Sequence, residues 1–216
     1  YSGQLVVHTR NVTARVTISD NAILRGGDVK LEAKADAKRN PTVRDSSLST
    51  AVLLLDKVIS VFGGVTYSEA TAEIIIGDGV VINGTKLTLT TQAKSNGTFS
   101  PTVKFSTVLG ISVATSKSTG RIEIGSAGGD DVFLAAQNDI LITSQVNGLL
   151  SASATVFHAG KVPGKFPDVA FSYGKSTLIN NLLLHENVTL IAGGNLDVKA
   201  LAEKNSSVGA TVGAFE

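Results

Sequence analysis

Apolar and polar residues alternate with a period of two along several stretches of the chain. Leu87 and Leu89 alternate with threonines, and Leu196, Val198 and Ala200 alternate with charged residues. Successive side chains of a β-strand point to opposite faces, so this pattern predicts strands with one buried face. Only residues 51–61 could form a short helix.

The alternating strands belong to units that repeat along the chain. Residues 13–35 recur without a gap at 71–93, a third copy with a five-residue insertion covers 120–145, and a fourth covers 182–200. Equivalent apolar positions, spaced 58, 48 and 61 residues apart, are Val16, Ile74, Ile122 and Leu183. Unequal spacing of a constant unit predicts one scaffold with loops of variable length.

These units predict a single repeat array without separate domains. Approximate repeats are 1–47, 48–104, 105–167 and 168–207, and residues 208–216 would open a fifth. Both ends of the chain then fall inside a repeat, and the chain contains no methionine with which translation could start. We therefore expect a processed chain or a segment cut from a longer array.

Three all-β architectures fit short strands separated by turns. A propeller blade usually carries tryptophan and other aromatic signatures, whereas this chain has no tryptophan. Sandwich domains would repeat at about 100 residues. The pattern therefore favours a parallel β-solenoid built from four degenerate repeats of 48–61 residues.

Strands of a solenoid stack in register, so an inward position should be apolar in every copy. Two such rows are Val29, Leu87, Ile140, Leu196 and Leu31, Leu89, Ile142, Val198. Apolar residues shrink from leucine to alanine along each strand, which predicts a tapering interior. With roughly two to three coils per repeat and about 4.8 Å per coil, the rod would be roughly 40–55 Å long and have two open sheet edges.

The repeat motif resembles that of large secreted bacterial surface proteins. An apolar strand and an Asn/Thr-rich turn are followed by T-A-x-[IV]-x-I-[GS]-D, a short apolar strand, Gly-Gly and an alternating strand that ends in alanine. This order is clearest in residues 13–37, 71–93 and 182–202. This pattern is similar to filamentous-haemagglutinin-type and leukotoxin-like filamentous adhesins. The resemblance implies a right-handed parallel β-helix in an extracellular filament at the cell surface, with no catalytic residues to transfer.

Composition narrows the classes of function. The 216 residues are 43% hydrophobic, with 19 basic and 18 acidic side chains, so a nucleic-acid partner held by phosphate contacts is not expected. The absence of cysteine excludes thiol chemistry and disulfides. No apolar run approaches the roughly 18 residues of a membrane-spanning helix.

Acidic residues in the third repeat are the best metal candidates. Asp130 and Asp131 follow two glycines, and Asp139 lies nearby in sequence, so carboxylate oxygens could bind calcium. An exposed acidic loop explains the same residues, because the nonapeptide repeat of calcium-binding β-helices is missing. Asp20 and Asp78 share one repeat position, where turn formation explains short polar side chains better than a metal ladder does.

The alternative hypothesis is a carbohydrate-active enzyme or glycan-binding module on the same scaffold. Parallel β-helices host polysaccharide lyases, hydrolases and epimerases, which need paired carboxylates or a calcium ion with basic residues in one groove. Such a constellation could be drawn from Lys86, Arg121, Asp130, Asp131 and Asp139. Because the four repeats are nearly equivalent, none of them offers a distinct catalytic site. We therefore expect that the chain is not an enzyme and holds no resident cofactor.

Five N-x-[ST] sequences are candidate N-glycosylation sites if the chain is exported, namely Asn11, Asn83, Asn96, Asn187 and Asn205. The sequence thus predicts a secreted, rod-like segment of an adhesin or surface fibre. Its expected partners are neighbouring repeats or copies of itself stacked end to end, with host or matrix glycans as candidate ligands.

Overall fold

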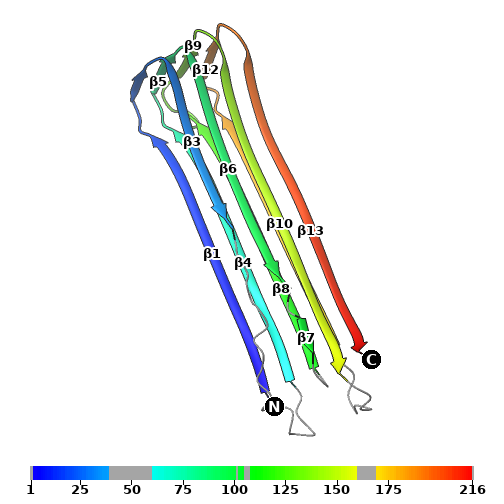
Figure 1. Ribbon diagram of the computed structural model, residues 1–216. Coiled ribbons are helices and arrows are strands. Elements are labelled where there is room, and N and C mark those ends of the chain that lie inside the picture. Colours follow the sequence, from blue (N-terminus) through cyan, green and yellow to red (C-terminus); the bar gives the residue numbers. More distant parts are fainter. Residues whose placement is uncertain (1, 39–59, 101, 105–107, 160–168, 216) are drawn as a thin grey trace.

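The computed structural model describes residues 2–38, 60–100, 102–104, 108–159 and 169–215, where the chain forms thirteen strands (Figure 1). Helices are missing from these ranges. Most of the segment 51–61, which the sequence allowed as a short helix, lies outside the described residues. Its last two residues belong to a strand. The prediction of an all-β chain is confirmed.

The strands form three parallel sheets. The first long sheet contains β1 (Ser2–Ile18), β4 (Ser60–Ile76), β8 (Val108–Ile124) and β11 (Val169–Leu184). The short sheet contains β2 (Ile23–Arg25), β5 (Val81–Gly84), β9 (Val132–Ala136) and β12 (Val188–Ala192). The second long sheet contains β3 (Asp28–Ala37), β6 (Lys86–Phe99), β10 (Ile140–Ala159) and β13 (Leu196–Phe215), and β7 (Thr102–Lys104) pairs with β10.

One coil of the solenoid consists of a long strand, a short strand and a returning long strand. The two long sheets face each other, and the short sheet closes one end between them (Figure 1). Both chain termini lie at the opposite end of the long strands (Figure 1). The predicted parallel β-solenoid of four repeats is therefore confirmed.

Each sequence repeat forms one coil. β1 pairs with β4 along its length, from Ser2 beside Ser60 to Ile18 beside Ile76. Four coils at about 4.8 Å each span about 15 Å along the stack, so the predicted two to three coils per repeat and the rod of roughly 40–55 Å are wrong. The long dimension runs along the strands, where 17 residues at about 3.3 Å reach about 55 Å.

Two details of the predicted repeats also change. Leu182, not Leu183, pairs with Ile122 in the neighbouring coil, and Leu183 is 42% exposed. Residues 208–215, predicted to open a fifth repeat, form the end of β13 in the fourth coil. Serine and threonine at inward positions interrupt the apolar alternation, so the strands look shorter in the sequence than they are.

The interior is widest beside the short sheet. There the predicted rows are confirmed, since Leu87 and Ile140 pair in register and are fully buried. Full burial of one such side chain stabilises the fold by about 1.5–3 kcal/mol. Other fully buried members of this wide end are Ile74, Ile76, Ile82, Leu89, Ile122, Ile124, Leu134 and Ile142.

Away from the short sheet the two long sheets approach each other closely, as the predicted taper requires. A methyl group on Gly97 of β6 would lie 2.7 Å from the carbonyl oxygen of Thr115 in β8. Ala114, Ser116 and Ser118, which face inward beside this point, are fully buried and small. The sheet separation therefore excludes large side chains at these rows.

Serine hydroxyls of the first long sheet bond the backbone of the second. Ser118 accepts the N–H of Ser95 (3.0 Å) in β6 and donates to the carbonyl of Asn147 (2.6 Å) in the neighbouring strand β10. Ser68 and Ser172 do the same in the other two gaps of this sheet, with Asn96 and Ala37 and with Ala154 and Gly209 respectively. Ser68 and Ser118 are buried and Ser172 is half-buried, and each hydroxyl both finds its partners and ties the two sheets together.

Gly97→Ala should destabilise the fold by about 1–3 kcal/mol, because the new methyl group would push the long sheets apart. Chemical denaturation measures the change in the free energy of unfolding. Gly209→Ala is the matched control, since a methyl group at Gly209 of β13 would meet no atom within 4 Å. Equal effects of the two substitutions would contradict the close approach at Gly97.

Candidate interaction surfaces

The stack of coils is open at both ends. Within the described residues, no strand pairs with the outer edges of β1, β2 and β3, here called the first end, or of β11, β12 and β13, here called the last end. Each of these edges presents unpaired backbone N–H and C=O groups, which can pair with another strand.

The last end also exposes the core. Leu196 is 50% exposed, although Leu87 and Ile140 in the same row are fully buried. Leu196 is therefore exposed because no further coil of the described chain packs on the last one, although it is as apolar as the buried members of its row. Other inward apolar residues exposed at the last end are Leu184, Val198, Val208 and Val212.

Charged side chains join neighbouring coils on the outer face of the first long sheet. Arg15 of the first coil binds Glu73 of the second, with Nη2 2.5 Å and Nε 2.7 Å from Oε2. Lys117 of the third coil lies 2.7 Å from Glu69 of the second. Both pairs remain open to solvent at the basic side chain, so each contributes on the order of 1 kcal/mol.

Glu69 is the centre of a three-residue cluster on this face. The Lys117 ammonium group, with a smaller contribution from the Tyr67 hydroxyl, lowers the pKa of the Glu69 carboxyl. The hydrogen bond from Tyr67 to Glu69 in turn raises the pKa of the phenol. Glu69 therefore binds both Tyr67 in its own strand β4 and Lys117 in the neighbouring strand β8. Within the cluster, the one carboxylate and the one ammonium group are already paired with each other.

Asp20 and Asp78 lie in the turns between the first long sheet and the short sheet, as predicted. Their hydrogen bonds reach the next coil rather than their own turn. Asp20 accepts the backbone N–H of Asp78 (3.0 Å), and Asp78 accepts the N–H (2.7 Å) and hydroxyl (2.6 Å) of Ser126. The Ser126 hydroxyl holds the pKa of the Asp78 carboxyl below its usual range. These carboxylates therefore align successive turns.

The calcium candidates are divided by a strand. Asp130 and Asp131 precede β9, whereas Asp139 follows it. Asp139 accepts the N–H of Asn195 (2.9 Å) and so links the third and fourth coils. In the part of the chain that the structure describes, no three histidine, aspartate or glutamate side chains gather in a way that could hold a metal ion.

The basic residues of the alternative enzyme site also lie apart. Lys86 begins β6 in the second long sheet, and Arg121 lies in β8 of the first long sheet, where it binds Glu123. Glu123 also lies 3.4 Å from His185. Arg121 therefore belongs to the ion pairs of the outer face.

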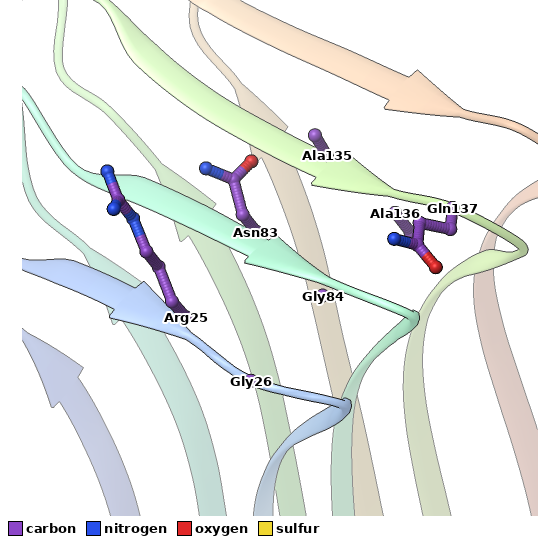
Figure 2. A pocket seen from close by; sticks show the side chains of 7 residues that line it. All are labelled: Arg25, Gly26, Asn83, Gly84, Ala135, Ala136 and Gln137. Carbon is purple, nitrogen blue, oxygen red and sulfur yellow. The ribbon is translucent and has the colours of Figure 1, made fainter.

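An open depression lies on the short sheet, at a place that the sequence did not indicate. Figure 2 shows the side chains of Arg25, Asn83 and Gln137 around it, from three neighbouring coils. Its other lining residues are Gly26, Gly84, Ala135 and Ala136, so the lining contains no carboxylate. A methyl group on Gly84 would lie 2.7 Å from the carbonyl oxygen of Gly27, so this last residue of β5 must be glycine.

The five candidate glycosylation sites differ in accessibility. Asn11 and Asn205 are exposed on long strands, whereas Asn83 lines the depression. The amide of Asn187 donates to the carbonyl of Asp130 (2.6 Å), and Asn96 accepts the Thr98 hydroxyl (2.6 Å). Asn11 and Asn205 are thus the sites where a glycan would displace the fewest contacts.

Comparisons of the chain with protein-family models, with curated proteins and with solved structures found no match. Among the described residues, no helix is long and apolar enough to cross a membrane.

Asp78→Asn should lower stability at neutral pH, because a single amide oxygen cannot replace both carboxylate oxygens that bond Ser126. The depressed pKa means that this contribution is present above the ordinary carboxyl pKa of about 3.9 and is lost as pH falls through the lower folded value. The gap between native and variant chains should therefore narrow below about pH 4. Denaturant unfolding at several pH values measures this difference in the free energy of unfolding.

Asp131→Asn in the next turn is the charge-matched control for Asp78→Asn. A stability gap for Asp78→Asn that stays constant from neutral to acidic pH would contradict the role assigned to its carboxylate.

Proposed function

We propose that this chain is a rigid segment of an extracellular surface fibre or adhesin. The observation that carries the proposal is the pair of open ends on an in-register stack. Such a stack can be continued by further coils at either end, each adding the same backbone hydrogen bonds and the same buried rows. Length is then gained without a change in local structure.

Rigidity supports the same proposal. Long strands pair in register across all four coils, and serine hydroxyls tie the facing sheets together. Bending such a segment would break several of these bonds at once. Freedom from cysteine and methionine also suits a chain in an oxidising environment, because their sulfur atoms are the main sites of side-chain oxidation.

The long outer faces are the surfaces that such a fibre would show to its surroundings. They carry ion pairs between coils and hydroxyl and amide side chains such as Asn205 and Ser207. Polar rows of this kind can bind the hydroxyl groups of matrix or host glycans through hydrogen bonds. In this proposal, adhesion results from polar rows that repeat along the outer faces and not from a single binding pocket.

Electron microscopy of source cells with an antibody against the folded chain tests the proposal. We expect labelled filaments that project from the cell surface, and no label after the antibody has been absorbed with the purified chain. Label confined to the cell interior would contradict it.

A further inference from the structure

We propose that the last end of one copy of this chain docks on the first end of a second copy, in the register that already relates its own coils. This inference rests on the proposed function and adds the identity of the partner. The occupant of each open end is then a second copy, arranged head to tail, and the contact extends the parallel sheets from one molecule into the next.

The buried rows continue across this contact. In the second long sheet, the row that ends at Leu196 would be followed by Val29 of the second copy, and Val198 by Leu31. In the first long sheet, Leu182 and Leu184 would meet Val16 and Ile18. Apolar residues meet apolar residues at each of these positions, so docking removes the exposed core of the last end from water.

Charges on the outer face of the second long sheet fit the same register. One row reads Lys30, Thr88, Leu141, Asp197, and the next reads Glu32, Thr90, Thr143, Lys199. Both rows are neutral in the middle coils and charged at the ends, with opposite signs at the two ends. Docking would place Lys30 beside Asp197 and Glu32 beside Lys199, and opposite charges directly across two strands stabilise their pairing.

Slipped registers lose this match. A shift of one residue turns every inward side chain outward. A shift of two residues in one direction places Lys199 beside Lys30 and Asp197 beside Asp28. The opposite shift places Asp197 beside Glu32 and Lys199 beside Lys34. Each slip therefore creates two like-charge pairs.

Some positions oppose the contact. The proposed register places Glu203 beside Asp36 on the outer face. Lys204 pairs with Gly148, whose position faces the inward residues Leu178 and Ser176, so docking would bury the lysine next to Ala37. On the facing sheet, Arg10 bonds the carbonyl of Lys38 (2.6 Å), which adds a second cation to this region. These charges limit the affinity, because unpaired buried charges are costly.

Sedimentation velocity of the chain over a range of concentrations tests the contact. We expect reversible linear association that weakens with salt. One variant reverses the first end (Lys30→Asp with Glu32→Lys), and another reverses the last end (Asp197→Lys with Lys199→Glu). Each alone should weaken self-association about tenfold. A mixture of the two variants should restore linear association, with the two variants alternating, because the last end of each variant then carries charges opposite to those of the first end of the other. A chain carrying all four substitutions should associate like the native chain.

Two further variants act as controls. Exchanging the charges of Glu69 and Lys117 (Glu69→Lys with Lys117→Glu) alters an ion pair away from the ends and should leave association unchanged. Lys204→Ser, which matches Ser95 in the same row, should strengthen association several-fold. Circular dichroism of each variant shows whether its strands are retained.

A native chain that stays monomeric would overturn this contact, and so would association that ignores the charge reversals. Neither result would contradict the proposed function, because a fibre can also consist of one long polypeptide. The surface labelling tests that function separately.

Discussion

In-register parallel pairing between coils is the constraint on which the rest of the structure depends. Because neighbouring strands pair residue by residue, most strand positions belong to a row that crosses three or four coils. In the middle coils, the members of an inward row face the same interior, so they are large and apolar where the sheets lie apart and small or hydroxyl-bearing where the sheets lie close. The repetition of the sequence follows from that requirement.

The inward rows also determine the shape of the coil. Isoleucine and leucine beside the short sheet hold the long sheets apart, whereas glycine, alanine and serine let them approach farther along the strands. Where the sheets are closest, serine hydroxyls enter the ladder of the facing sheet and satisfy its backbone groups. The interior therefore changes along each strand from an apolar core to a hydrogen-bonded contact between two sheets.

The parallel solenoid, its buried rows and its tapering interior could be predicted from the sequence, because they follow from the spacing and size of apolar residues such as Leu87 and Ile140. The number of coils could not, since inward Ser118 and Ser144 interrupt the alternation and conceal strands of up to 20 residues. Contacts between coils were also hidden: the bond from Ser126 to Asp78 joins residues 48 positions apart. Asp130, Asp131 and Asp139 are close in sequence, but β9 separates them, which local spacing alone does not reveal.

The most direct test of one coil per repeat is the distance between the first and fourth coils. Thr9 and Lys175 belong to one outward row, and the absence of native cysteine allows spin labels on Thr9→Cys and Lys175→Cys. Measured in chains diluted with unlabelled protein, the separation of the labelled positions should be about 15 Å, or three coil spacings. A separation of roughly 30–45 Å, which the six to nine coil spacings of two to three coils per repeat would require, would contradict this architecture.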